Sequence, residues 1–473
     1  MNKYYLHCAI PYVNARPHIG HALEFIQTDT VGRYHRLLGE DVLQLTGGDE
    51  NALKNVQAAE TAGEDVQSFV DKNAQLFKDL TAKLNTQFDV FQKGSNKEKH
   101  YLASQKLWKL CEAAGDIYKK TYRGLYCVGC ETFYASDELS ENGECYEHPG
   151  RKLEEVEEEN YFFRLSKYQN KIIQLIESEE HKVTPEKRKN EVLSFLKSGL
   201  RDISISRTNQ RAKNWGVPVP GDPTQRIYVW FDALNIYQSG VGFGWDEAIY
   251  NKWWPADLEV IGKGIIRFHA VYWIAFLLSA GLKIPKTLLV HDYFTVNGQK
   301  MSKTLGNVYD PVPLVEKYGA DPIRYYCLAK ISPFEDGDFS ESKFVETYNA
   351  DLANNLGNLI SRVAKLAENI GLSAPGAGQY TFDREVIDRL ETYEFHLALQ
   401  VIWSWIDSLN KKIDIGKLWE NTAEKQSALE EIIQEIHKIA YNLQPFLPET
   451  ADKIQKQFYS EVKVDKPLFP RIK

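Results

Sequence analysis

The spacing of apolar and polar residues divides the chain into a part where strands and helices alternate and a later part that is wholly helical. The apolar run KYYLHCAI (3–10) predicts a buried strand, and apolar positions three or four apart from about His18 to Gly39 predict a helix. DVLQLTGGDEN (41–51) predicts a second strand that runs into a glycine turn. Strand, helix and strand at these lengths form a βαβ unit, so we expect a parallel sheet that binds ligands at the carboxyl ends of its strands.

Strand-then-helix patterning resumes after a long intervening segment. RIYVWFDALNIY (226–237) and DLEVIGKGII (257–266) fit this pattern, and AVYWIAFLLSAGL (270–282) predicts a buried helix because it is too short to cross a membrane. Amphipathic helices are predicted near 352–370 and 429–443. The expected fold is α/β, with a Rossmann-type parallel-sheet core that is interrupted by an insertion and followed by an α-helical bundle.

Composition agrees with an ordinary globular protein. The chain has 473 residues, of which 43% are hydrophobic and 26% charged. The N-terminal stretch MNKYYLHCAIPYV has a proline inside its short apolar run and no small-residue cleavage pattern, so we expect a cytoplasmic protein without a signal peptide. The net charge of −8 argues against general affinity for polyanions but leaves room for a local basic face.

The segment 182–213 is a candidate for such a face, since it carries nine lysines and arginines against three acidic residues. Without further evidence we interpret it as the solvated surface of a helix. The acidic run at 154–159 is interpreted in the same way.

Three of the six cysteines form a compact group with a histidine. The spacing is C-x2-C-x14-C-x2-H, and the group consists of Cys127, Cys130, Cys145 and His148. Two tight turns that each present two ligands complete a tetrahedral zinc site, and four protein ligands leave no open position, so the zinc would be structural. A redox C-x-x-C would leave the second pair without a role, and disulfides are unusual in the cytoplasm. The isolated cysteines, which are expected in the core, are Cys8, Cys111 and Cys327.

Two histidines, His18 and His21, bracket Gly20 where a proline-led turn runs into the first helix. Histidine is a poor choice for opening an ordinary helix, and glycine weakens the helix further. A helix N-terminus offers unpaired N–H groups and a partial positive charge to a phosphate, and imidazoles there add donors that follow a developing charge. The alternative is a pair of surface histidines in an awkward turn.

A second candidate for phosphate binding is the stretch NGQKMSKTLG (297–306). Lys300 and Lys303 lie three apart between two glycines, which suits a mobile basic loop that closes over a polyphosphate. Taken alone, the stretch equally fits a charged hairpin tip.

The two stretches together, HIGH at 18–21 and KMSKT at 300–304, are the signature pair of class I aminoacyl-tRNA synthetases, which the sequence strongly resembles. Within that class it is similar to the methionyl family, in its zinc-containing short form, over essentially the whole chain. Matching stretches include AIPYVNARPHIGH, CVGC with CYEH, NYFFRLSKY, YVWFDALNIY, VNGQKMSKTLGNV and NLISRV. The resemblance implies a methionine–tRNA ligase that activates methionine with ATP and Mg²⁺ and then charges tRNA(Met).

The resemblance also implies roles for individual residues. The catalytic and ATP-binding residues would be His18, Gly20, His21, Lys300 and Lys303. The methionine-binding residues would be Ile10, Tyr12, Asp49, Trp230, Ala233, Leu234, Tyr237, Ile265, His269 and Trp273, with Asp49 holding the substrate ammonium. An aromatic-lined apolar cavity suits a polarisable thioether. By pattern alone, the aromatic members of this set fit plain core packing equally well.

The same family resemblance assigns the recognition of the anticodon to Asn358, Arg362 and Trp419. Asn358 and Arg362 are four apart and share one helical face. Base-edge hydrogen bonds and aromatic stacking are the usual means of reading a single-stranded loop. Trp419 has a competing interpretation as a packing residue of the bundle, since it follows Leu418 where the family prefers proline.

The sequence departs from the family pattern at a few positions. Asn51 and Ala52 stand where the family usually has His-Gly, Gly48 replaces a threonine, and Thr304 replaces the last serine of the lysine motif. The serine-to-threonine change keeps a hydroxyl. The change at 51–52 puts contacts near the adenylate in doubt.

Other members of the class share parts of this pattern. Leucyl, isoleucyl and valyl relatives carry an editing insertion that is too large for residues 117–225. A cysteinyl enzyme shares the first motif and a cysteine near the first strand, here Cys8, but its zinc ligands are scattered rather than compact. A further alternative is not an enzyme: it is a catalytically inactive synthetase-like protein that serves as a tRNA-binding or regulatory protein. The intact histidines and lysines of both motifs favour the enzyme.

The resemblance divides the expected architecture into five segments. These are 1–116, the first half of the catalytic core; 117–225, a connective insertion with a zinc knuckle; 226–290, the second half of the core; 291–343, the lysine-motif loop and stem-contact region; and 344–473, the α-helical anticodon-binding domain. The sequence ends at PLFPRIK without the dimerisation module that many relatives append, so a monomer is expected.

Overall fold

The computed structural model describes residues 2–127, 132–134, 139–146, 150–301, 306–373, 380–420, 425–460 and 462–472. The chain divides into two compact units. The first unit comprises Met1–Pro17, Glu40–Thr81 and Gln87–His291, and the second comprises His18–Gly39, Ala82–Thr86 and Asp292–Lys473. The helix that begins after His18 therefore belongs to the same unit as the C-terminal part of the chain.

A six-stranded parallel sheet forms the centre of the first unit, with the strand order β3-β2-β1-β12-β13-β7. Its strands are β1 (Lys3–Cys8), β2 (Asp41–Gly48), β3 (Val90–Lys93), β7 (Lys182–Thr184), β12 (Leu258–Gly262) and β13 (Thr287–His291). Strands β1 and β12 lie 250 residues apart in sequence and pair in the register His7↔Glu259. The prediction of an α/β fold with a parallel sheet is confirmed.

The first unit also contains nine described α-helices. They are α2 (Leu53–Ala62), α3 (Val66–Lys83), α4 (His100–Ala113), α5 (Gln169–Glu177), α6 (Glu186–Lys197), α7 (Val229–Leu234), α8 (Ile236–Ser239), α9 (Glu247–Trp253) and α10 (Ile274–Ser279). Of these, α5, α6, α8 and α9 contact strands of the parallel sheet. The long helix predicted at 270–282 is shorter and irregular, since a π-helix, η4 (Phe268–Trp273), leads into α10. Trp108, Phe231 and Trp273 are fully buried in this core.

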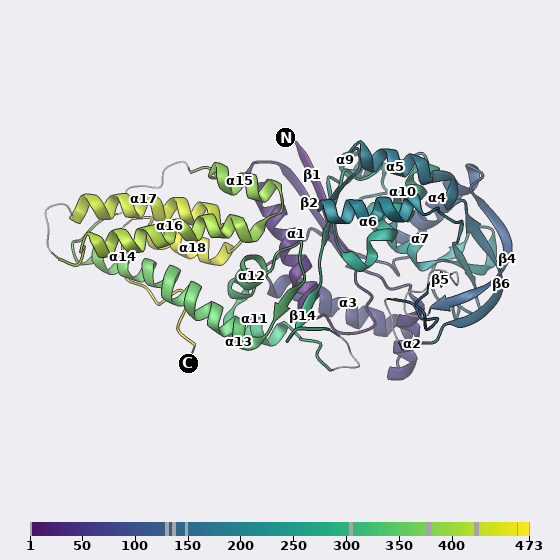
Figure 1. Cartoon of the computed structure of the whole chain (residues 1–473), viewed down its shortest axis with the longest axis horizontal. Helices are drawn as coiled ribbons and strands as arrows, with labels where there is room; N and C mark the ends of the chain where they lie inside the picture. Colours follow the sequence, from purple (N-terminus) through teal and green to yellow (C-terminus); the bar gives the residue numbers. More distant parts are fainter. Residues whose placement is uncertain are drawn as a thin grey trace. The chain divides into compact units, whose positions relative to one another are not determined.

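The segment 117–225 folds largely around a second, antiparallel sheet. The long strands β4 (Ile117–Cys127) and β6 (Glu154–Phe163) lie side by side, flanked by β5 (Thr132–Tyr134) and β8 (Ile203–Ser204) (Figure 1). A three-stranded sheet is built from β9 (Ser206–Thr208), β10 (Pro218–Val219) and β11 (Asp222–Ile227). The segment is not wholly separate from the core, because its strand β7 pairs with β13 at the edge of the main sheet.

The second unit is mostly helical, as the sequence predicts. Its elements are α1 (Ile19–Leu37), β14 (Phe294–Val296), β15 (Gln299–Lys300), α11 (Val312–Tyr318), α12 (Ala320–Ala329), β16 (Gly337–Phe339), α13 (Glu341–Thr347), the π-helix η5 (Tyr348–Gly357), α14 (Asn358–Glu368), α15 (Arg384–Glu391), α16 (Phe395–Ile415), α17 (Lys425–Leu443) and α18 (Pro448–Gln457). Helices α14, α16, α17 and α18 pack as a bundle (Figure 1). Helix α16 buries an apolar stripe at spacings of three and four.

Surface charges of the basic segment 182–213 are partly compensated by local acidic partners. Arg188 pairs with Glu191 and Lys197 pairs with Glu177. The interpretation of the segment as the solvated surface of a helix holds only in part, because Arg188 and Arg207 are buried and the helix α6 covers only Glu186–Lys197. Of the helices described, none combines the length and apolar character needed to cross a membrane.

Candidate active site

The N-terminus of α1 is capped by its own two histidines. His18 is the N-cap in extended conformation, and its Nδ1 atom accepts a hydrogen bond from the backbone N–H of Gly20 at 3.1 Å. His21 Nδ1 accepts in turn from the backbone N–H of His18 at 3.0 Å. This reciprocal arrangement satisfies two N–H groups that a helix start otherwise leaves unpaired. The expectation that histidine suits this position poorly was therefore wrong, because the imidazole nitrogen replaces the usual capping oxygen.

The capping bonds also fix which ring nitrogens carry protons. Because both Nδ1 atoms accept hydrogen bonds, each neutral ring carries its proton on Nε2. The rings of His18 and His21 stack with centroids 3.7 Å apart. Burial, together with the neighbouring His18, lowers the pKa of His21, so the imidazole stays neutral near pH 7. The start of α1 thus presents two N–H donors together with the positive end of the helix dipole.

The second signature stretch adjoins this helix start within the second unit. A Cβ atom on Gly20 would come within 3.3 Å of Met301 Cε. The backbone N–H of Ile19 donates to the carbonyl of Tyr309, which follows the lysine motif, at 2.9 Å. The backbone of Lys300 belongs to β15, which pairs with β14, whereas Lys303 lies outside the described residues.

The expected methionine-binding residues belong to the first unit, and the contacts bring several of them together. Asp49 follows β2, and its backbone N–H donates to Pro11 at 2.9 Å. Asp49 also forms an isolated parallel bridge with Tyr12. The Tyr12 ring lies edge-on to Trp230 at 6.3 Å, and Trp230 stacks on Phe268 at 3.7 Å.

A second group of these residues centres on Tyr237. Its hydroxyl lies 2.9 Å from His269 Nε2, while His269 Nδ1 lies 3.0 Å from the carbonyl of Ile265. Nδ1 therefore carries the proton, and Nε2 accepts from the tyrosine. Burial lowers the pKa of His269 to about 4, so the ring is uncharged at neutral pH. The Trp273 ring lies edge-on to Tyr237 at 6.5 Å. The remaining members of the set, all packed in or against this core, are Ile10, Ala233 and Leu234.

Sequence reasoning missed a buried polar network beside the methionine candidates. Asn51 Nδ2 donates to the carbonyl of Gly94 at 2.8 Å and to Asp232 Oδ2 at 2.6 Å. Asp232 Oδ1 also accepts a hydrogen bond from the Ser104 hydroxyl at 2.7 Å and lies 2.9 Å from His100 Nε2. Asn51 stood out in the sequence as a departure, but an isolated histidine at residue 100 gave no signal. The Asn51 carboxamide thus fixes the side chain of Asp232, a residue that lies in the sequence between two methionine-binding candidates, Trp230 and Ala233.

The described half of the cysteine cluster is compact. Cys127 Sγ and Cys145 Sγ lie 3.5 Å apart, and both residues are buried. This separation is far longer than a disulfide bond of about 2.05 Å. Cys130 and His148 lie outside the described residues, so the part of the chain that the structure describes holds no group of three or more metal-binding side chains. Burial raises the pKa of both Cys111 and Cys327 to about 12, as expected for inert core thiols.

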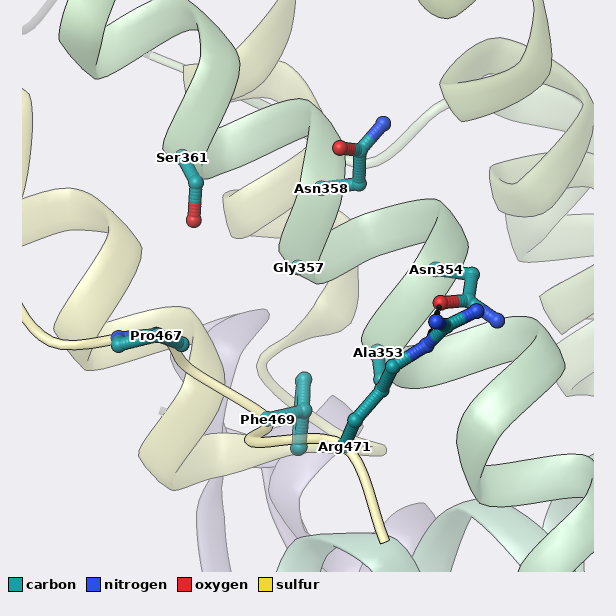
Figure 2. A pocket seen from close by; sticks show the side chains of 8 residues that line it. All are labelled: Ala353, Asn354, Gly357, Asn358, Ser361, Pro467, Phe469 and Arg471. Carbon is teal, nitrogen blue, oxygen red and sulfur yellow. Dashed lines mark hydrogen bonds between the residues drawn. The ribbon is translucent and has the colours of Figure 1, made fainter. Parts of the chain in front are cut away.

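The anticodon candidates lie on the exposed side of the second unit. Asn358 begins α14 and lines a groove of about 590 Å³ together with Ser361, Arg471 and Asn354. Figure 2 shows Arg471 beside Asn354, to which its Nε donates at 2.8 Å. Arg362 pairs with Asp414 of α16 at 2.6 Å.

Trp419 lies just beyond the end of α16, and its side chain is 53% exposed, whereas the preceding Leu418 is 5% exposed. The leucine, and not the tryptophan, packs into the bundle. This exposure argues against the interpretation of Trp419 as a packing residue.

Comparison with known proteins gives consistent results. Residues 4–364 match the family model described as tRNA synthetases class I (M). The methionine–tRNA ligase of Thermotoga maritima is 41% identical over 98% of this chain and 76% of its own length. That of Brucella suis biovar 1 is 40% identical over 96% of this chain and 91% of its own length. The solved structure of Mycobacterium tuberculosis methionyl-tRNA synthetase in complex with methionyl-adenylate has a TM-score of 0.90 and 36% identity, covering 100% of both chains.

Proposed function

The chain belongs to the class I methionyl-tRNA synthetase family and is a methionine–tRNA ligase, and from this premise we propose how its own residues carry out the reaction. In the first step the methionine carboxylate attacks the α-phosphate of ATP in line, which gives methionyl-adenylate and pyrophosphate. In the second step the 2′-hydroxyl of the terminal adenosine of tRNA(Met) attacks the carbonyl carbon of methionyl-adenylate, and the methionyl ester forms as the bond to the phosphate breaks and AMP leaves. Mg²⁺ enters with ATP as part of the substrate.

Charge grows on the phosphoryl oxygens in the first step, and residues at the start of α1 stabilise it. His18 and His21 donate from Nε2, and the N-terminal end of the helix adds its dipole. Lys300 and Lys303 supply positive charge from the second motif. The capping bonds support this assignment, because they hold both rings in the tautomer that donates.

Methionine lies, in this proposal, in the aromatic pocket of the first unit. Asp49 holds the ammonium group. The walls are formed by the apolar and aromatic residues that the family resemblance assigns, namely Ile10, Tyr12, Trp230, Ala233, Leu234, Tyr237, Ile265, His269 and Trp273. The uncharged state of His269 supports the assignment, because a thioether offers no compensation for a buried charge.

Recognition of tRNA(Met) falls to the helical domain. Asn358 and Arg362 read base edges of the anticodon, and Trp419 stacks on a base. The exposure of Trp419 supports this role, since a stacking platform must be open to solvent in the free protein.

One structural zinc ion would be held by Cys127, Cys130, Cys145 and His148, and its role would be to hold the connective segment in shape. The described pair fits this group, because two thiolates bound tetrahedrally at about 2.3 Å from zinc lie about 3.8 Å apart, close to the observed 3.5 Å. The ion contributes no chemistry to the reaction, since its coordination is complete. The free thiols of Cys127 and Cys145 support a cytoplasmic location, since disulfides are rare there.

The closeness of the two signature stretches within one unit carries the proposal: the backbone N–H of Ile19 donates to the carbonyl of Tyr309, and a Cβ atom on Gly20 would come within 3.3 Å of Met301 Cε. An ATP–pyrophosphate exchange assay with purified protein and a panel of amino acids tests it. Exchange should depend on methionine. Exchange driven by cysteine, or by no amino acid, would contradict the substrate or the activity.

A further inference from the structure

A histidine and a glutamate form a buried pair at the centre of the main sheet. His7 of β1 and Glu259 of β12 are direct partners in the strand register. His7 Nε2 lies 3.1 Å from Glu259 Oε1, and both side chains are 0% exposed. Neither residue belongs to the methionine-binding set, and their position on adjoining strands brings together parts of the chain that are distant in sequence.

The pair touches the methionine pocket through Tyr237. The His7 ring stacks on the Tyr237 ring with centroids 3.8 Å apart and planes 13° apart. Tyr5, two residues earlier on β1, donates its hydroxyl hydrogen to the carbonyl of Tyr237. Because Tyr237 in turn donates to His269, a shift of His7 would move two residues that line the pocket.

The surroundings of Glu259 favour a neutral carboxyl group. Among the described residues, neither carboxyl oxygen of Glu259 accepts a well-directed hydrogen bond, although Oε1 lies 3.1 Å from His7 Nε2 and Trp273 Nε1 is nearby. A buried carboxylate with so few well-directed donors is unstable relative to its protonated form. Burial accordingly raises the pKa of Glu259 to about 7, although His269, His181 and Trp273 act to lower it.

We propose that His7 and Glu259 are positioning residues of the methionine pocket, and that methionine binds tightly only while Glu259 is protonated. This inference rests on the proposed function of the pocket. An ionised Glu259 would demand well-directed N–H donors, and a turn of the His7 ring towards the carboxylate would disturb its stack on Tyr237. The methionine side chain carries no charge that would compensate for the buried carboxylate.

The pKa values of the other titratable groups that face Glu259 are shifted away from neutrality. Burial lowers the pKa of His7 to about 3 and that of His269 to about 4. Burial also lowers the pKa of His181, which precedes β7, and raises that of Tyr5 well above its usual value. Glu259 is therefore the group in this cluster that loses a proton near neutrality.

The sign of the pH effect follows from linkage. If the protonated form binds methionine, binding takes up a proton and raises the pKa of Glu259. The affinity for methionine is then highest at low pH and falls as the pH rises through about 7, the pKa of Glu259 in the free protein. The dissociation constant for methionine should rise towards tenfold per pH unit above that point.

Isothermal titration of the full chain with methionine, in buffers of different ionisation enthalpy between pH 6 and 8, tests this inference. The unmodified protein should take up about half a proton per methionine at pH 7, as expected for a group at its pKa. Glu259→Gln, which stays neutral, should take up none and bind with a pH-independent affinity close to the low-pH value of the unmodified protein.

His7 is tested by comparing two variants. His7→Phe keeps a ring to stack on Tyr237 and should retain methionine affinity at pH 6.5 within about twofold, whereas His7→Ala should weaken it about tenfold without lowering kcat at saturating methionine. A pH-independent affinity in the unmodified protein, or the same pH dependence in Glu259→Gln, would overturn the inference. Failure of methionine to bind at any pH would instead contradict the proposed function.

Discussion

Gly20 and Met301 lie so close together that any side chain at residue 20 would meet both signature motifs. A Cβ atom on Gly20 would come within 3.0 Å of His18 Cε1 and 3.3 Å of Met301 Cε. Gly20 does not adopt a positive φ, so its lack of a side chain serves this close approach and not an unusual backbone conformation.

Gly20→Ala separates catalysis from stability. The added methyl group should push the His18 ring or Met301 aside and lower the rate of ATP–pyrophosphate exchange by about tenfold or more, since displacements near 1 Å can cost on the order of 10²-fold. The melting temperature should change little, because the gain of about 1 kcal/mol from alanine over glycine in a helix offsets the loss of about 1 kcal/mol if the displaced His18 ring no longer caps it. An unchanged exchange rate would show that the close contact has no catalytic role.

His18→Asn distinguishes the capping role of this residue from its catalytic role. Asparagine is among the best N-cap residues, so the helix should keep its stability, but the Nε2–H donor is lost. Exchange kcat should fall by about 10²–10³ while the KM for methionine changes little, as for a contact made in the transition state. His18→Ala serves as the comparison, because it should lose the cap as well, at about 1 kcal/mol of folding stability.

Metal analysis tests the cysteine cluster. Carefully prepared protein should contain one tightly bound zinc per chain, and Cys127→Ser should release it because a tetrahedral site loses one of its four ligands. Cys111→Ser is the matched control, since Cys111 is buried elsewhere in the first unit and should not affect metal content. Zinc-free protein, or a disulfide between Cys127 and Cys145, would contradict the assignment.

The anticodon assignment predicts that charging and activation respond differently to mutation. Trp419→Ala should cost about 1–3 kcal/mol of tRNA interaction, the usual loss for one stacked base. Charging of tRNA(Met) should therefore fall by about 5- to 150-fold, while ATP–pyrophosphate exchange stays unchanged. Asn358→Ala and Arg362→Ala should show the same separation.

A matched control for Trp419 is Tyr459→Ala, because Tyr459 is another exposed aromatic residue of the second unit, at 67% exposure, and has no assigned role. It should alter neither activity. If exchange and charging fell together in Trp419→Ala with a lowered melting temperature, Trp419 would be a packing residue.

The parallel core was predictable where apolar runs were long enough to identify strands. Strand β1 and the helix after His18 appear in the sequence with nearly the observed bounds. Strand β7 was missed, because three residues carry no periodic signal and its place in the sheet depends on pairing with β13, about a hundred residues later.

The candidate site was predictable as far as local motifs reach. The histidines of the first motif and the residues around Trp230 lie in short contiguous stretches, so the family resemblance could assign them, whereas by pattern alone the aromatic residues fit core packing equally well. The contact of Asn51 with Asp232 and that of His7 with Glu259 join residues 181 and 252 positions apart. Such contacts arise from strand register and helix packing, which no local pattern encodes.

Formation of methionyl-adenylate is the most direct test of the central claim that the chain activates methionine with ATP. Stoichiometric protein is mixed with methionine, Mg²⁺ and ATP in the absence of tRNA, quenched with acid and analysed for the adenylate by mass spectrometry. The account predicts close to one equivalent of methionyl-adenylate per protein chain in the presence of pyrophosphatase. The His21→Ala variant should form the adenylate about 10²–10³ times more slowly. Absence of the adenylate, or an equal yield of a cysteinyl or leucyl adenylate when those amino acids replace methionine, would contradict it.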